Sequence, residues 1–172
     1  HDTRALLRLG VALVEEGVAQ PRPAALDFVQ AAAAPLVLLT AWEALFDRAR
    51  LAAGQSVLIH AGAGGVGVPF GDADNRTAIQ LARHAGARVC TTVSSQEKAE
   101  FVRGLGAEEV VRYRDRDTVE AVMAWTGGRG VDAALDTVGP EVFRQTMAAV
   151  AHYGDLVTLL DPGPEMDWKA AR

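Results

Sequence analysis

The chain has 172 residues, 49% of them hydrophobic and 23% charged, which is typical of a folded globular protein and disfavours a disordered chain. The formal net charge of −5 disfavours nucleic acid and anionic membrane surfaces as partners, because both require clustered Lys and Arg side chains. A chain of this length buries roughly 70% of its unfolded surface in one core, so residues 1–172 are expected to form a single domain.

The N-terminal part is predicted to be helical. Apolar side chains recur at helical spacing in residues 3–18 and predict one amphipathic helix, which Pro21 and Pro23 end. A second helix begins near Ala24, and a third covers residues 40–50. No strand-rich domain precedes the first predicted strand.

An apolar run extends from Ala31 to Leu39 within this helical part. It is shorter than the about 20 residues of a membrane-spanning helix and contains Pro35, so it is predicted to be a buried helical segment. Cys90 is the only cysteine, which excludes an internal disulfide and fits a reducing compartment. We therefore expect a cytoplasmic protein that has no contact with a membrane.

Apolar runs alternate with segments of helical period in the rest of the chain. The runs predict strands at residues 56–61, 87–93, 109–113, 131–136 and 155–160. The segments between them predict helices at residues 76–85, 96–105, 118–125 and 141–152. Short right-handed crossovers between buried strands are typical of an α/β fold. The expected architecture is a doubly wound, Rossmann-like parallel sheet of about five to six strands with helices on both faces.

The first predicted strand leads into a glycine turn with the sequence GAGGVG. Gly62, Gly64 and Gly67 have the spacing of the dinucleotide fingerprint, in which glycines permit a sharp turn, close approach to a pyrophosphate and close helix packing. Gly65 and Val66 complete the turn, and the absence of a following Lys-Ser or Lys-Thr pair excludes a P-loop. The alternative is a glycine-rich turn that binds no ligand.

Ten residues, VPFGDADNRT, separate Gly67 from the helical segment that begins AIQLA. If the helix begins only at Asn75 or Thr77, its positive end lies away from the pyrophosphate site, and Asp72 and Asp74 bring negative charge toward it. Alternatively, the additional residues loop outward and leave the glycine turn intact. The second interpretation is favoured here.

The end of the second predicted strand indicates which cofactor is bound. NAD sites place an acidic residue there to bind the adenosine ribose, whereas a 2′-phosphate requires hydroxyls or cations. This chain has Ser94 and Ser95, followed by Lys98, which favours NADPH over NADH. Ser94 and Glu97 also satisfy a helix capping box, so a well-capped helix is the alternative, and both interpretations can hold together.

Few other side chains indicate chemistry. Asp136 ends the fourth predicted strand, and it is expected either to act over the ligand cleft or to cap the following turn. The four histidines and Cys90 lack the close spacing of a zinc site, so no metal is expected. His60 lies on a predicted buried strand, where a hydrogen-bonded core histidine is the expected role.

Three segments carry a resemblance to a known family: AAAAPLVLLTAWEALFDRARLAAGQSVLIHAGAGGVG, AIQLARHAGARVCTTVSSQEKAEFVRGLGAEEVVRYRDRD and GGRGVDAALDTVGPEVFRQTMAAVAHYGDLVTLL. With them the chain resembles the zinc-independent quinone oxidoreductase branch of the medium-chain dehydrogenase/reductase superfamily. The resemblance covers most of residues 24–160. It implies a nicotinamide cofactor-binding domain, with pyrophosphate near residues 64–67, a 2′-phosphate near Ser94, Lys98 and Tyr113, and Thr40 close to the nicotinamide.

The chain departs from that family in three respects. The connection after Gly67 is longer, and the family's barrel-like catalytic domain is absent. Residues 1–20 resemble a helix that lies late in the family's chain, so a rearranged or excised cofactor domain is expected. In that case residues 3–18 pack beside the strand at residues 155–160.

Two hypotheses about function follow. The first is the NADPH-binding domain of a quinone oxidoreductase-like enzyme that transfers hydride from nicotinamide to a quinone or enone. The cofactor performs that chemistry, so catalytic residues stay unknown, and this chain, with only one wall of the substrate cleft, is expected to be catalytically incomplete. The second is a non-catalytic or permuted Rossmann module that binds nucleotide weakly or not at all. In either case an unpaired final strand leaves a sheet edge able to form a homodimer.

Overall fold

A computed structural model describes residues 24, 28–62 and 71–160 of the chain, with the backbone alone for residues 28–33 and 71–74. The chain divides into two compact units, residues 1–35 and 36–172, and the second unit contains the whole sheet. The predicted helix over residues 3–18 and the glycine-turn residues Gly64, Gly65, Val66 and Gly67 lie outside the described residues.

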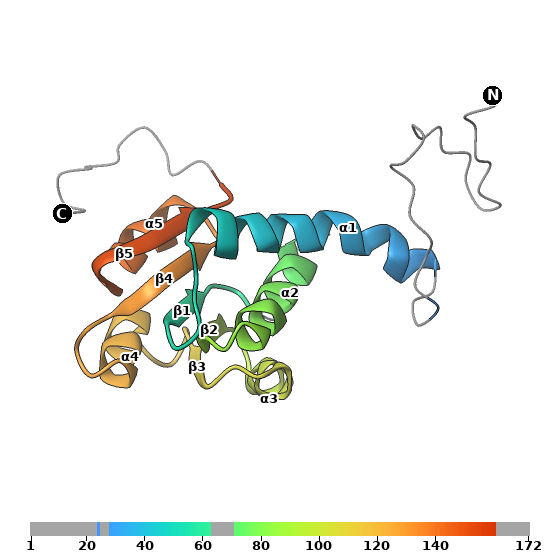
Figure 1. The fold of residues 1–172 in the computed structure, drawn as a ribbon. Coiled ribbons are helices and arrows are strands. Elements are labelled where there is room, and N and C mark those ends of the chain that lie inside the picture. The colour runs from blue at the N-terminus through green and yellow to red at the C-terminus, as the bar shows by residue number, and fades with distance from the viewer. Residues whose placement is uncertain (1–23, 25–27, 63–70, 161–172) are drawn as a thin grey trace, which may run out of the picture. The chain divides into compact units, whose positions relative to one another are not determined.

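Five parallel strands form one sheet with the order β3-β2-β1-β4-β5 (Figure 1). The chain builds the sheet outward from β1 to β3 and then returns to place β4 on the other side of β1. The strand order therefore reverses between β1 and β4, which is the topological switch point of a doubly wound sheet. The strands are β1 Ser56–Ile59, β2 Arg88–Val93, β3 Glu109–Arg112, β4 Val131–Asp136 and β5 Val150–Thr158.

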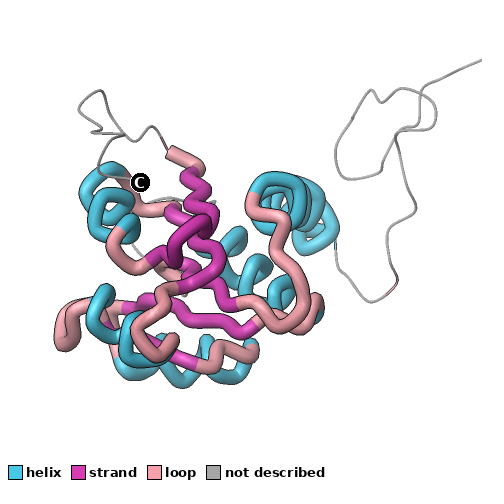
Figure 2. The backbone as a smooth tube through the Cα atoms, turned by 60° about the vertical axis from the view of Figure 1, so that its left-hand side comes forward, coloured by secondary structure: helices cyan, strands magenta, loops and turns pink. Residues whose placement is uncertain are grey.

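Helices cover both faces of this sheet (Figure 2). The face with α2, α3 and the π-helix η1 carries the larger apolar cluster, and the opposite face packs against α4 and α5. The predicted α/β, doubly wound architecture is therefore confirmed. The helices are α1 Phe28–Trp42, η1 Glu43–Arg48, α2 Gly71–His84, α3 Gln96–Leu105, α4 Thr118–Trp125 and α5 Pro140–Met147.

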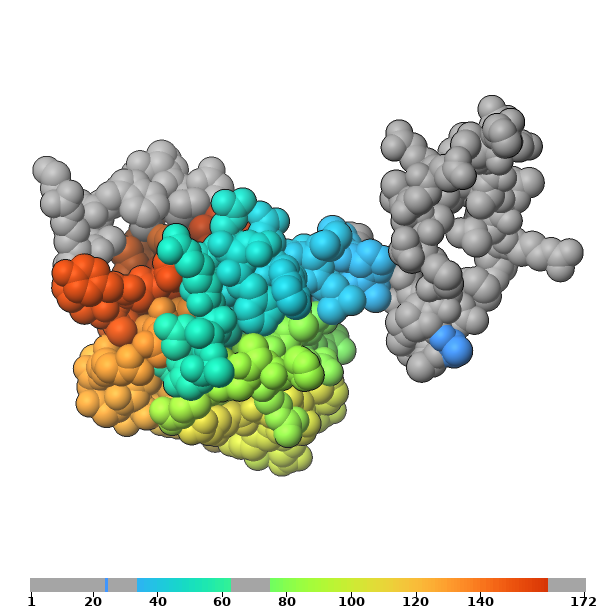
Figure 3. All heavy atoms as spheres, in the orientation of Figure 1, coloured from blue at the N-terminus to red at the C-terminus, as the bar shows by residue number. Residues whose placement is uncertain are grey.

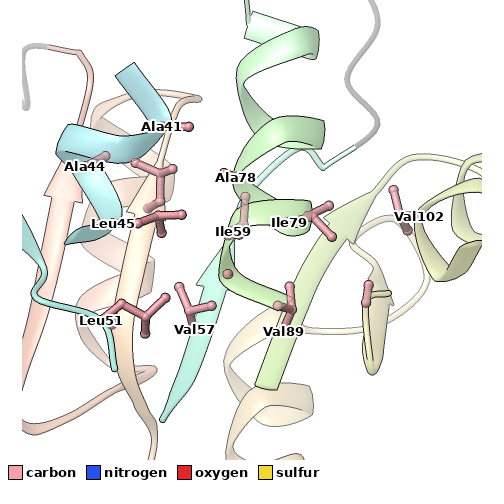
Figure 4. Close-up of a cluster of buried hydrophobic side chains, with 14 of the residues drawn as sticks. Ala41, Ala44, Leu45, Leu51, Val57, Ile59, Ala78, Ile79, Val89 and Val102 are labelled. Atoms are coloured by element: carbon pink, nitrogen blue, oxygen red, sulfur yellow. The ribbon is translucent and has the colours of Figure 1, made fainter. Parts of the chain in front are cut away.

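The core is divided between the two faces because successive strand residues point in opposite directions. Val57 and Ile59 of β1 join the cluster beneath α2 and η1, which Figure 4 shows, whereas Leu58 joins the cluster beneath α4. All four residues of β1 are buried, as expected for the central strand of a parallel sheet. This two-sided core holds the carboxyl ends of the strands in a fixed relation.

The last helix and strand differ from the predicted ones. α5 ends at Met147 instead of continuing to His152, and β5 begins at Val150 instead of Asp155. Val150 pairs with Val131 of β4, and a register shift follows before the ladder resumes at Asp155. Pairing with β4 therefore prevails over the helical period of the sequence.

The apolar run in α1 is helical, but its predicted burial is wrong. Leu36, Leu38 and Leu39 are 57%, 45% and 68% exposed, whereas Val37 is buried. All residues from Leu36 to Leu39 are apolar, yet among them only Val37 is buried, because one side of a helix faces the core. No helix among the described residues is long and apolar enough to cross a membrane.

Candidate functional site

The turn after β1 lies at the switch point, where ligands of such sheets bind beyond the carboxyl ends of the strands. Ala61 adopts a positive φ of 51°, and its N–H donates to Thr92 Oγ1 at 2.9 Å. The N–H of Gly62 donates to the carbonyl of Thr92 at 3.1 Å. A Cβ at Gly62 would overlap with Thr91 Oγ1 and crowd Ile79 of α2. The turn therefore requires glycine at this position because β1, β2 and α2 approach closely.

Helix α2 begins inside the VPFGDADNRT segment, at Gly71. This start is earlier than either Asn75 or Thr77, and also earlier than the start of the predicted helix over residues 76–85. Asn75 is buried, with 1% of its surface exposed. Its Nδ2 donates to Ala61 O at 3.2 Å and to Thr137 Oγ1 at 2.9 Å. Part of the segment is therefore built into the fold at the switch point.

His60 directly precedes this turn and is buried in a hydrogen-bonded chain. Thr146 Oγ1 donates to the Val142 carbonyl at 2.6 Å, so it accepts the 2.7 Å hydrogen bond from His60 Nε2. Nδ1 is then left as the acceptor for Thr92 Oγ1 at 3.3 Å. Burial lowers the pKa of His60 to about 4, so the ring is neutral at physiological pH. His60 is a satisfied core histidine, as the sequence predicts.

Asp136 is fully buried at the end of β4 and holds the following turn. Its Oδ1 accepts from the N–H groups of Val138 at 2.9 Å and Gly139 at 3.4 Å, and its Oδ2 accepts from Thr158 Oγ1 at 3.4 Å. Burial raises the pKa of Asp136, against the effect of these donors. Two roles were predicted for Asp136, action over the ligand cleft and capping of the following turn, and these hydrogen bonds correspond to the cap.

The carboxyl ends of β2 and β3 bring together residues expected near a 2′-phosphate. The N–H of Tyr113 donates to the Val93 carbonyl at 3.2 Å, so Tyr113 lies beside the residues that follow β2. Ser95, and not Ser94, is the N-cap of α3, because its Oγ accepts from the Lys98 N–H at 3.3 Å. The predicted capping box of Ser94 with Glu97 is therefore wrong, and the Ser94 hydroxyl takes no part in the cap.

Thr40 lies in a groove between the α1–η1 helical segment and β5, with a volume of about 680 Å³. These two parts of the molecule lie side by side in Figure 3. The Thr40 hydroxyl donates to the carbonyl of Leu36 at 2.9 Å. The groove is lined by Leu36, Leu39, Thr40, Glu43, Ala44, Arg48, Asp155, Leu156, Val157, Thr158 and Leu159.

A polar pair in this groove was not predicted from the sequence. Arg48 contacts Glu43 Oε1 through Nη2 at 2.7 Å and through Nε at 3.2 Å. The two residues are five apart, a spacing that an α-helix does not stack but a π-helix with its i to i+5 hydrogen bonds does. A search for helical spacing of three or four cannot find such a pair.

The described side chains do not fit a zinc ion. Within that part of the chain, no three His, Cys, Asp or Glu side chains gather closely enough to hold a metal. Both nitrogens of His60 have hydrogen-bond partners, and burial raises the pKa of the Cys90 thiol, which disfavours the thiolate that zinc binds. Zinc independence stays a prediction.

Residues 76–160 match the family model described as "Zinc-binding dehydrogenase". A highly reducing polyketide synthase of Cryptosporiopsis sp. (strain 8999) is 40% identical over 140 residues, which are 80% of this chain and 6% of that protein. The chain thus spans about one twentieth of the length of the curated relatives it matches.

Solved structures are similar over a larger share of their own chains. The CurK enoyl reductase is 32% identical with a TM-score of 0.74, over 87% of this chain and 42% of that one. A mycobacterial protein complexed with NADPH is 35% identical with a TM-score of 0.75, over 87% and 45%. The quinone oxidoreductase of Coxiella burnetii is 36% identical with a TM-score of 0.66, over 80% and 38%. With its fold, its glycine turn and these similarities, the chain belongs to the medium-chain dehydrogenase/reductase superfamily, of which it carries the cofactor-binding domain.

Proposed function

We propose that this chain binds NADPH as the cofactor-binding domain of a reductase that transfers hydride to an enone or a quinone. The observation that carries the proposal is the turn at Gly62, which lies at the switch point of the sheet and cannot hold a Cβ. A glycine that permits a sharp turn and close packing of the helix on the strands is what the first part of a dinucleotide-binding turn requires. Residues 64–67 continue the same glycine sequence and are proposed to face the pyrophosphate.

The end of β2 supports NADPH over NADH. Ser94 and Ser95 stand where an acidic residue would bind the ribose of NADH, and Lys98 lies in the first turn of α3. The N-terminus of this ten-residue helix carries a partial positive charge, which favours a phosphate. We assign the 2′-phosphate to Ser94, Ser95, Lys98 and Tyr113.

The remaining predicted residues position the cofactor. Asp136 orders the turn after β4, and Thr40 is proposed to lie near the nicotinamide. When bound, the nicotinamide supplies the hydride, so the residues of this chain bind and orient the cofactor without performing the chemistry. A second domain must supply the other wall of the substrate cleft.

Of these two substrate classes, an α,β-unsaturated acyl group is favoured over a quinone. The reason is similarity to an enoyl reductase and to reducing polyketide synthases, because the geometry of this chain alone distinguishes neither substrate. Turnover is expected only when the catalytic domain is present. Reduction of an enoyl thioester by this chain combined with a catalytic domain, followed by the loss of NADPH absorbance, would test the assignment.

Titration with NADPH and NADH, followed by nicotinamide fluorescence, tests cofactor binding. Saturable binding with preference for NADPH is expected. Ser94→Asp should reverse the preference, because its carboxylate repels the 2′-phosphate and accepts from the ribose hydroxyls of NADH. Gln145→Asp, which introduces the same charge at an exposed position of α5, is the matched control. Absence of binding at millimolar cofactor would contradict the proposal.

A second candidate function is a Rossmann module that does not bind nucleotide. The observation in its favour is the start of α2, where Asp72 and Asp74 occupy the first turn of the helix. Acidic residues at this position disfavour an approaching phosphate. Asp72→Asn with Asp74→Asn should then strengthen NADPH binding, and no change would argue against this candidate.

β5 is proposed as a homodimer edge. It is the last strand in the described sheet order, and Tyr153 on it is 94% exposed. An unpaired strand edge is a template for pairing with a second copy. The N–H of Leu159 donates to Asp136 of β4, so the N–H of Leu156, which alternates with it, faces the free edge. Sedimentation of the chain should show a dimer that Leu156→Pro dissociates, and a monomer, or a dimer that this variant leaves intact, would contradict the use of this edge.

A further inference from the structure

One buried side chain joins the two turns between which the strand order reverses. Asn75 lies in α2, and its Nδ2 donates both to the carbonyl of Ala61, after β1, and to the hydroxyl of Thr137, after β4. β1 and β4 are neighbours in the sheet. Asn75 therefore bridges the base of the crevice in which a doubly wound sheet binds its ligand.

The orientation of the Asn75 amide follows from its partners. The carbonyl of Ala61 can only accept a hydrogen bond, so the nitrogen of the amide must face it. The oxygen, Oδ1, is then not the atom that bonds to either turn. This oxygen is buried and has no hydrogen-bond partner in the described part of the chain. Buried acceptors are rarely left unpaired in native proteins, because the lost hydrogen bond destabilises the fold.

The neighbouring residues prevent the Asn75 amide from rotating to give Oδ1 a hydrogen-bond partner. Ala61 is fixed by its hydrogen bond to Thr92 Oγ1. The turn of Thr137 is fixed by Asp136, which accepts from the next two N–H groups. Rotation of the amide would place Oδ1 against the Ala61 carbonyl oxygen, which is repulsive. The oxygen is therefore available to accept a hydrogen bond from a donor outside the described residues.

The chemistry of a dinucleotide limits what that donor can be. A pyrophosphate carries no hydrogen-bond donor at neutral pH, whereas ribose hydroxyls and the nicotinamide carboxamide do. In the sheet, β4 lies on the opposite side of β1 from β2 and β3, whose ends carry Ser94 and Tyr113. Asn75, which bridges the turns after β1 and β4, should therefore contact the half of the cofactor that does not contain the 2′-phosphate.

We propose that Asn75 is a positioning residue for the nicotinamide half of the bound dinucleotide. Its Nδ2 sets the separation of the turns after β1 and β4, and its Oδ1 accepts a hydrogen bond from a ribose hydroxyl or the carboxamide of that half. The inference rests on the proposed function and deepens it. It also gives Asn75, one of the additional residues after Gly67, a role within the site.

Calorimetric titration of the chain with NADPH and with 2′,5′-ADP, which lacks the nicotinamide half, tests this proposal. Asn75→Ala should weaken NADPH binding about tenfold, the loss of one or two hydrogen bonds, and change 2′,5′-ADP binding less than about twofold. Thr137→Val, which removes one partner of the bridge, should weaken NADPH binding in the same selective way and by less. Gln80→Ala is the matched control, because Gln80 is an exposed amide on the same helix.

The outcomes are separable. Equal weakening of both ligands by Asn75→Ala and Thr137→Val, or weakening of neither, would overturn the role of Asn75 and leave the proposed function standing. Failure of the unmodified chain to bind either ligand would overturn both. If Asn75→Ala does not fold, as thermal unfolding would reveal, Thr137→Val alone decides the question through its selectivity for NADPH.

Discussion

Protonation of His60 should control the stability of this fold below neutral pH. Burial lowers the pKa of His60 from 6.5 to about 4 in the folded chain. The unfolded chain therefore binds this proton below about pH 6.5, whereas the folded chain binds it only below about pH 4. The unfolded state holds more protons in that window. The free energy of unfolding should therefore fall as the pH decreases from 6.5 to 4.

The magnitude follows from the difference between the two pKa values of His60. Each pKa unit corresponds to about 1.4 kcal/mol, so complete loss of the contribution amounts to about 3 kcal/mol. Protonation also places a second donor, Nδ1–H, beside Thr92 Oγ1, which already accepts from Ala61 N–H. The destabilised region is then the turn after β1, so NADPH binding should weaken over the same pH range.

Urea unfolding of the chain and of His60→Gln, at intervals from pH 7.5 to 4, measures this effect. The variant should be less stable at pH 7.5 but show a flatter pH dependence, since glutamine does not titrate. Asp136 opposes the trend, because its raised pKa makes the folded state bind a proton first as the pH falls. The comparison of the two proteins cancels that contribution, since both retain Asp136.

His84→Gln, which removes an exposed histidine from the end of α2, is the matched control for the histidine substitution. Its pH dependence should follow that of the unmodified chain. Parallel curves for His60→Gln and the unmodified chain would refute the assignment of the acid sensitivity to His60.

Three further substitutions test the structure. Asp132→Asn should lower the free energy of unfolding at neutral pH by about 1–2 kcal/mol, because Arg129 lowers the pKa of Asp132 to about 2. This loss of stability should vanish below about pH 2, and a loss that is the same at every pH would contradict the ion pair. Gly62→Ala should cost about 2 kcal/mol through overlap at the turn after β1, and an unchanged urea midpoint would disprove that overlap. Glu108→Ala should cost at most about 1 kcal/mol, since its ion pair with Arg88 is exposed, and the difference should shrink in 1 M salt.

Local signals account for the parts of the fold that were predicted correctly. The structure gives α3 and α4 the residues 96–105 and 118–125 that the sequence predicts. Ser95 and Asp117 cap their N-termini through side-chain oxygens, and Gly106 ends α3 with a φ of 108°. Each cap acts within a few residues of the helix end, so the sequence near that end contains the necessary information.

Predictions failed where the deciding contact comes from a distant part of the chain. β5 begins at Val150 because Val131 of β4 pairs with it, although residues 141–152 have a helical period. The exposure of Leu39 likewise depends on which surfaces the unit offers to α1. The sequence indicated Asn75 only as a possible start of the helix after VPFGDADNRT, because its two partners, Ala61 and Thr137, lie 14 and 62 residues away.

The sequence by itself determined the α/β class, the alternation of strands and helices and the glycine turn after β1, because periodicity, caps and glycine spacing act over short distances. Only the tertiary structure decided that α2 extends back to Gly71, that Asp136 caps a turn and that Asn75 bridges the switch point. Those features arise where β1 and β4 become neighbours. The pairing of β1 with β4 depends on the order of strands in the assembled sheet, and no short stretch of sequence specifies that order.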